Sequence, residues 1–146
     1  WDPYARGMVV GLTRATRKSH LVRATLESLA YQNYELLKVM ERDSGVEAPV
    51  FRVDGGASAN DFLMQFQADL LGIPVERPKS VETTALGAAY LAGLAIGFWE
   101  SKEEIKKLRP LDKVYEPHRS RKEMKALLHG WNRAVQTALF WAQWHE

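Results

Sequence analysis

The stretch VFRVDGGASAN, residues 50–60, decides the fold of this chain. Its first four residues include two valines and a phenylalanine, which favour a β-strand. The next three, Asp-Gly-Gly, are typical of a tight turn. Ser58 and Asp61 stand at the spacing of a capping box, which predicts that a helix begins at Ser58 and ends near Gly72. The stretch is therefore predicted to be a strand, a turn and a helix.

A second short strand is expected at residues 73–76, between Gly72 and Pro78. Strand, helix and strand at this spacing favour a parallel pair with a right-handed crossover. Pro74 has no amide hydrogen to donate, which favours a position at the edge of the sheet. The predicted fold class is therefore α/β, with short parallel strands flanked by helices.

The rest of the chain has a largely helical pattern. Apolar residues at helical spacing predict a long helix from Ser19 to a C-cap at Gly45. Residues 84–96 predict a helix that is apolar on nearly every side, and we expect it to be buried. Further predictions are a short charged helix at residues 101–108, a connecting loop at 109–119 and a terminal helix at about 120–144. Two strands form too small a sheet for these helices, so we expect it to be incomplete, with further strands upstream of Trp1.

Composition sets the broad class of the protein. A chain of 146 residues with 46% hydrophobic residues is the size of one domain and apolar enough to fold. It has no cysteine, which excludes disulfides and thiolate metal ligands and fits a reducing cytoplasm. Its most apolar stretch, residues 85–99, is shorter than the roughly 18 residues of a membrane span. We therefore expect a protein of the cytoplasm that does not enter the membrane.

Charge and histidine spacing exclude two further classes. The formal net charge is +2, and the basic residues are dispersed among acidic ones. A nucleic-acid binder usually concentrates its basic residues on one face, so no nucleic acid is expected as a partner. The four histidines lack the i, i+4 spacing of a helical zinc site. No metal site is therefore predicted from them.

The sequence DGGASAN, residues 54–60, is the strongest candidate for a binding site, and we call it the glycine turn. Gly55 and Gly56 allow a sharp bend and close approach of a ligand to the backbone. The following helix would present free backbone N–H groups, which suit phosphate oxygens, and the Asn60 amide suits a base or a ribose. A plain strand-to-helix turn that binds nothing fits the spacing equally well. The pattern is neither a P-loop nor a dinucleotide fingerprint.

Nearby polar residues have two interpretations each. Asp54 ends a strand, where it could hold a metal ion or act as a base, but a role in stabilising the turn is favoured. Thr83 and Thr84 precede the apolar helix and could contact a phosphate, but helix capping is favoured. Gly87 is interpreted as a packing residue. No catalytic residue is predicted from these positions.

GMVVGL at residues 7–12 is followed, after the gap 13–19, by HL at 20–21 and ATLE at 24–27. This pattern resembles the second signature of the FGGY carbohydrate kinases. Other segments look like those of family members that act on glycerol: WDPYARG (1–7), RVDGG (52–56), FLMQFQ (62–67), VERP (75–78) and TALGAAYLAG (84–93). The resemblance is specific up to about Trp99 and looser beyond it.

The resemblance implies an actin-like, ribonuclease H-like domain and the transfer of a phosphoryl group from Mg²⁺-ATP to glycerol. Residues 1–146 would be the C-terminal nucleotide-binding domain, without its upstream strands and without the N-terminal domain that binds glycerol. The nucleotide contacts of the family fall on Gly56 and Asn60, with Gly55 in the same turn. The acceptor contacts and the catalytic aspartate of the family lie upstream. The chain alone is therefore expected to be inactive.

Three other hypotheses stay open at this point. The protein could be an FGGY kinase that acts on a pentulose or on gluconate. It could be a non-catalytic assembly module, because an incomplete sheet with exposed apolar surface favours homo-oligomers. Nucleic-acid binding rests only on a basic composition and scattered aromatic residues.

Overall fold

The computed structural model of the protein describes residues 2–80, 82–108 and 110–143. Its elements along the chain are α1 (Lys18–Ser44), β1 (Phe51–Arg52), the 3₁₀-helix η1 (Gly56–Ala59), α2 (Asp61–Leu71), β2 (Val75–Pro78), α3 (Thr83–Ala95), α4 (Lys102–Lys107), β3 (Leu111–Tyr115) and α5 (Arg121–Ala142). The predicted α/β class is confirmed, and the sheet of the described residues is small, with three strands in the order β1-β2-β3.

The sheet contains the predicted parallel pair. Phe51 of β1 is in register with Val75 of β2, and the two strands run in the same direction. β2 nevertheless lies in the centre, because β3 pairs antiparallel on its other side, and the edge position predicted from Pro74 is wrong. Pro74 precedes the strand, and its carbonyl accepts a hydrogen bond from the Phe51 amide at 2.8 Å. Its missing N–H therefore interrupts no ladder bond within β2.

β3 occupies part of the segment that was predicted to be a loop. Tyr115 pairs with Val75 and Val114 with Glu76, so the strand is defined by a partner almost 40 residues away. Of its five residues only Tyr115 is buried, so no strong apolar alternation marks the strand in the sequence. The loop prediction is therefore wrong for residues 111–115.

The helix α1 agrees with its prediction at both ends. It begins at Lys18, one residue before the predicted start, and ends at Ser44, with the predicted Gly45 as its C-cap at φ 71°. The Gly45 amide donates to the Glu41 carbonyl at 2.9 Å, as expected of a left-handed C-cap. The terminal helix α5 is capped by Ser120, whose hydroxyl accepts from the Glu123 amide in a capping box.

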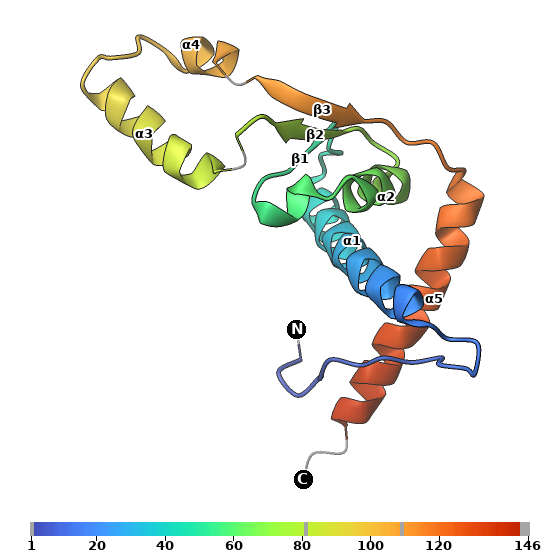
Figure 1. The fold of residues 1–146 in the computed structure, drawn as a ribbon. Coiled ribbons are helices and arrows are strands. Elements are labelled where there is room, and N and C mark those ends of the chain that lie inside the picture. The colour runs from blue at the N-terminus through green and yellow to red at the C-terminus, as the bar shows by residue number, and fades with distance from the viewer. Residues whose placement is uncertain (1, 81, 109, 144–146) are drawn as a thin grey trace.

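The core lies where α1, α2 and α5 meet beneath the sheet (Figure 1). The Tyr31 ring packs edge-on against Phe66 at 5.6 Å and stacks on Trp131 at 5.1 Å. These three rings come from α1, α2 and α5, so one aromatic cluster holds all three helices together.

The helix α3 departs from its predicted environment. Figure 1 shows α3 and α4 extending away from the rest of the molecule. Among the described residues of α3 only Gly93 is buried, and Leu91 is 69% exposed. The prediction of a buried helix is therefore wrong for this chain. An apolar helix becomes buried only where another element offers a facing surface, and among the described residues β2 and β3 pack against α2.

Gln67 gives a first test of the core. Its side chain is buried, accepts from the Asn33 amide at 3.0 Å and donates to the Ala30 carbonyl at 3.3 Å. We expect Gln67→Leu to destabilise the protein by about 1–3 kcal/mol, because the buried Gln67 amide loses its bonds to Asn33 and to the buried Ala30 carbonyl. Thermal unfolding of the purified protein measures this loss. The exposed Gln32→Leu is the control and should change stability by less than about 0.5 kcal/mol.

Candidate functional site

The glycine turn connects the end of β1 to the start of α2. Gly55 has φ 75° and ψ 172°, a backbone conformation that only glycine adopts readily. The Ser58 amide and hydroxyl both donate hydrogen bonds to the Gly55 carbonyl, at 3.1 and 2.7 Å. The chain then forms one turn of 3₁₀-helix, Gly56–Ala59. The turn is therefore a defined structure that depends on the glycine at position 55.

The helix after the turn begins later than predicted. Asn60 is the N-cap of α2, and its side-chain oxygen accepts from the Leu63 amide at 3.0 Å. Ser58 is buried and donates to Gly55, so the predicted capping box of Ser58 and Asp61 is wrong. The 3₁₀ turn displaces the start of α2 by three residues. Because its oxygen forms the cap, the Asn60 NH₂ group is the part that can donate to a ligand.

The candidate contact residues lie on an accessible surface. Gly56 and Asn60 are exposed. A Cβ atom built on Gly56 would meet no atom within 4 Å. The backbone at this position is therefore open to a ligand.

Asp54 has a partner outside the turn. Its carboxylate accepts a hydrogen bond from the Thr83 hydroxyl, which ties the end of β1 to the first residue of α3. Thr83 therefore does not cap α3, whose N-cap is Glu82, and the capping prediction for Thr83 is wrong. Asp54 is accordingly positioned as a link between two elements.

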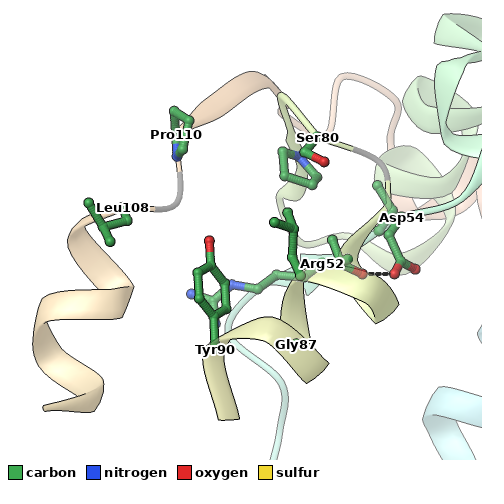
Figure 2. Close-up of a pocket in the computed structure, with 11 residues that line it drawn as sticks. Arg52, Asp54, Ser80, Gly87, Tyr90, Leu108 and Pro110 are labelled. Atoms are coloured by element: carbon green, nitrogen blue, oxygen red, sulfur yellow. Dashed lines mark hydrogen bonds between the residues drawn. The ribbon is translucent and has the colours of Figure 1, made fainter. Parts of the chain in front are cut away.

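A cavity of about 520 Å³ lies beside this link, between the strand ends, α3 and the segment after α4. Figure 2 shows Tyr90 pointing from α3 towards it, with Leu108 and Pro110 on the opposite wall and Asp54 at one end. Gly87, expected to be a packing residue, lines this cavity. Its volume suits a small ligand. Gly55, Gly56 and Asn60 are not among its lining residues, so the structure separates the cavity from the candidate contacts.

Charged residues from β2 and β3 gather at the beginning of α2. The Asp61 carboxylate accepts hydrogen bonds from Tyr115 at 2.6 Å, from Lys113 at 2.9 Å and from Arg77 at 2.9 Å. These three donors hold the pKa of Asp61 well below its usual range, with the Tyr115 hydroxyl as the largest cause. Burial and the bond to Asp61 raise the pKa of Tyr115 to about 12. Asp61 is therefore fixed as an anion.

Sequence reasoning missed this cluster because its members are far apart in the chain. Arg77 follows Asp61 by 16 residues, and Tyr115 follows it by 54. The one available signal is the pair of opposite charges Asp112 and Lys113, in a segment that the sequence predicts to be a loop. The pairing of β2 with β3 brings the cluster together.

The low pKa of Asp61 predicts that the contribution of this residue to stability depends on pH. A carboxylate whose pKa is lowered on folding stabilises the protein above its unfolded pKa, near 3.8, and loses that effect as the pH falls towards the folded pKa. We therefore expect Asp61→Asn to lower the melting temperature at pH 7, and the difference from the wild type to narrow steadily below about pH 4. Thermal unfolding of both proteins from pH 7 to pH 2.5 measures it. A difference that is constant over this range would contradict the assignment.

The described part of the chain has neither a metal-binding cluster nor a membrane-spanning helix. Within residues 2–80, 82–108 and 110–143, no three His, Cys, Asp or Glu side chains are grouped to hold a metal ion. None of the described helices is long and apolar enough to cross a membrane.

Comparison with known proteins identifies relatives over almost the whole chain. The chain is 57% identical to glycerol kinase of Caldanaerobacter subterraneus over 98% of its own length and 29% of that protein. It is also 57% identical to glycerol kinase 1 of Clostridium tetani, over 97% of the chain and 28% of that protein. The chain thus spans less than a third of the length of the curated relatives it matches.

Solved structures show the same fold. The crystal structure of Plasmodium falciparum glycerol kinase with ADP matches 92% of the chain and 27% of that protein, at a TM-score of 0.83 and 39% identity. A ligand-bound xylulose kinase from Lactobacillus acidophilus matches 95% of the chain and 28% of that protein, at a TM-score of 0.77 and 29% identity. These neighbours confirm that the three strands and their helices are part of the actin-like, ribonuclease H-like fold of these kinases.

The first 96 residues of the chain match a known protein family. Residues 1–96 match the C-terminal domain of the FGGY family of carbohydrate kinases. This segment contains α1, β1, the glycine turn, α2, β2 and α3. The chain therefore belongs to the FGGY family of carbohydrate kinases and contains that family's C-terminal domain.

Proposed function

We propose that residues 1–146 are the C-terminal nucleotide-binding domain of a kinase that transfers the γ-phosphoryl group of ATP to glycerol and forms glycerol 3-phosphate. The observation that carries the proposal is the glycine turn, which exposes Gly56 and Asn60 immediately before α2. Support comes from the 57% identity to glycerol kinases and from a related glycerol kinase solved with ADP. ATP and ADP are accordingly the proposed ligands of this domain.

The chemistry of the turn favours the nucleoside part of the nucleotide. Asp61 places a negative charge in the first turn of α2, which opposes a phosphate there. Arg77 and Lys113 offset this charge but point their donors at Asp61 itself. A neutral base or ribose can approach Gly55 and Gly56 and accept a hydrogen bond from the Asn60 NH₂ group. We therefore expect the nucleoside beside the glycine turn and the phosphates farther from it.

The remaining parts of the reaction are assigned to the rest of the protein. Phosphoryl transfer requires positioning of the acceptor, a base and the Mg²⁺ ion carried by ATP. We assign no protein ligand of this ion to the described residues. Glycerol and the catalytic base are expected in the domain that precedes this one. We therefore propose that the 146-residue chain alone does not phosphorylate glycerol. The lack of cysteine fits a reducing compartment, and we propose that the full-length enzyme acts in the cytoplasm.

The choice of acceptor follows from the relatives. The two sequence relatives above are glycerol kinases, whereas solved structures with 29–30% identity are a xylulose kinase and a gluconate kinase. We expect the full-length protein to release ADP from ATP with glycerol and much more slowly with xylulose or gluconate. A coupled assay with the three acceptors measures this. A clear preference for xylulose or gluconate would show that glycerol is not the acceptor. The proposed nucleotide site would be unaffected by that result.

Asn60→Asp tests the nucleotide site separately from the acceptor. Aspartate caps a helix about as well as asparagine, so the melting temperature should change little. The variant loses the NH₂ donor, and we expect the Kd for ADP to rise about tenfold, the equivalent of one hydrogen bond of about 1.4 kcal/mol. Isothermal titration of the full-length protein with ADP measures it. Wild-type affinity in a folded Asn60→Asp variant would remove Asn60 from the site.

A second candidate function is assembly. Leu91, Ile96 and Phe98 are large apolar side chains that are 69%, 82% and 70% exposed, and their burial against another protein would be favourable. In this alternative the domain contributes a homo-oligomer interface and no nucleotide site. A native mass of the full-length protein that stays monomeric over a hundredfold range of concentration would exclude it.

A further inference from the structure

Arg77 extends from β2 to the glycine turn. One of its terminal nitrogens donates to the Ser58 carbonyl at 2.9 Å and to the Asp61 carboxylate at 2.9 Å. Ser58 is in the 3₁₀ part of the turn, and Asp61 is the first residue of α2. The guanidinium group therefore holds the end of the turn and the start of the helix at once.

The other edge of the same guanidinium group is anchored on β3. Its Nε donates to the Asp112 carboxylate at 2.8 Å, and its second terminal nitrogen lies 2.7 Å from the same oxygen. The group also lies over the Tyr115 ring, 5.4 Å from its centre. Only 13% of the Arg77 side chain is exposed. Arg77 is therefore held by β3 on one side and by the glycine turn on the other.

Among the described residues, two side-chain links hold the glycine turn to elements that do not adjoin it in sequence: the Thr83 hydroxyl of α3 bonds to Asp54 at its start, and Arg77 bonds to Ser58 near its end. Within the turn the bonds are local, from Ser58 to Gly55 and from the Asn60 amide to the Ala57 carbonyl at 3.2 Å. Gly55 and Gly56 give the backbone more freedom than any other residues would. Local bonds shape the turn, but they do not set its place relative to the sheet. The bond from Arg77 to the Ser58 carbonyl links the turn directly to β2.

We propose that Arg77 is a positioning residue, which holds the glycine turn and the Asn60 cap in the conformation that accepts the nucleotide. The inference rests on the proposed nucleotide site and adds a residue that is not one of the proposed contacts, Gly55, Gly56 and Asn60. A planar guanidinium group donates hydrogen bonds to Ser58, Asp61 and Asp112 together, whereas a lysine ammonium group at the same place can donate to fewer of them. If only a fraction of molecules has the correct turn, the apparent Kd rises by the inverse of that fraction.

The test uses full-length protein and ADP as the ligand. In Arg77→Gln the 3₁₀ part of the turn loses its side-chain link to β2 and β3, and we expect the Kd for ADP to rise about tenfold, which corresponds to a competent fraction of about one tenth. Arg77→Lys keeps the charge without the planar fork and should give an intermediate Kd. The KM for ATP should rise in parallel, while the KM for glycerol stays within about twofold, because only the nucleotide contact depends on the turn.

The chain offers a matched control in a second arginine that pairs with an aspartate of α2. Arg119 pairs with Asp69, near the other end of α2, at 3.6 Å. Arg119→Gln therefore removes an arginine–aspartate pair without touching the glycine turn. We expect it to leave the Kd for ADP unchanged, even where its melting temperature falls as far as that of Arg77→Gln. Titrations are made at least 15 °C below the lower of the two melting temperatures, so that both variants are folded.

Two outcomes overturn the inference. A folded Arg77→Gln variant that binds ADP within about twofold of the wild type would show that Arg77 does not position the turn. Equal losses of affinity in Arg77→Gln and Arg119→Gln would show that the loss reflects general stability. Asn60→Asp in the same titration separates this proposal from the proposed function. If Asn60→Asp loses affinity and Arg77→Gln does not, only the role of Arg77 is wrong, whereas wild-type affinity in both rejects the nucleotide site itself.

Discussion

Gly55→Ala is expected to raise the Kd of the full-length protein for ADP by at least tenfold and to destabilise it by about 1–3 kcal/mol. Gly55 has φ 75° and ψ 172°, a region that a residue with a Cβ atom rarely occupies. The alanine variant must either keep this strained conformation or change the path of the turn. A changed path would move the Gly55 carbonyl, which accepts two hydrogen bonds from Ser58, and with it Gly56 and Asn60.

Gly45→Ala is the matched control for this prediction. Gly45 also has a positive φ, 71°, but it caps the end of α1, away from the glycine turn. Alanine there should cost about 1 kcal/mol and leave the affinity for ADP unchanged. Titration with ADP and thermal unfolding measure both quantities in each variant. If Gly55→Ala bound ADP as tightly as Gly45→Ala, the conformation of residue 55 would have no part in nucleotide binding.

Phe66→Ala is expected to cause the largest loss of stability, about 3–5 kcal/mol. The Phe66 side chain is only 2% exposed and packs edge-on against Tyr31, which in turn stacks on Trp131. Removing the ring leaves a cavity at the point where α1, α2 and α5 meet. Chemical or thermal unfolding of the purified protein measures the loss.

Phe62→Ala is the control, since it removes the same side chain one helical turn earlier. Phe62 is 39% exposed, although its ring stacks on Phe66 at 6.2 Å. Water already reaches this ring, so the substitution should cost less than about 1 kcal/mol. Losses of equal size at the two positions would contradict the placement of the core between the helices.

The elements that were predicted correctly carry their own local signals. The helix α1 has apolar residues at helical spacing and a glycine at its end, and both features lie within one segment. The parallel pair of β1 and β2 followed from two short strands separated by a helix. Such signals depend only on neighbouring residues, so one sequence is sufficient to detect them.

The elements that were missed depend on distant residues. β3 is a strand because it pairs with β2. Four of its five residues are exposed, so its sequence lacks the apolar alternation typical of a half-buried strand. The start of α2 was misplaced because both Ser58 and Asn60 are good caps, and the 3₁₀ turn that selects Asn60 is stabilised by Gly55. The exposure of α3 depends on which surfaces are present around it, which the helix sequence does not specify.

For the candidate site, the sequence predicted the turn but not its support. Gly55, Gly56 and Asn60 lie close together in the sequence, so they can be recognised as one motif. Arg77, Asp112 and Tyr115 join this motif only through the pairing of β2 with β3. The role of the three motif residues in binding a nucleotide stays a prediction, and the supporting cluster explains how the turn would be held for it.

The most direct test of the central claim is an experimental structure of the full-length protein with ADP bound. We predict that the nucleoside of ADP lies against Gly55 and Gly56, with the Asn60 NH₂ group within hydrogen-bonding distance of a base or ribose atom. ADP bound away from the glycine turn, for example in the cavity lined by Tyr90 and Leu108, would contradict the account.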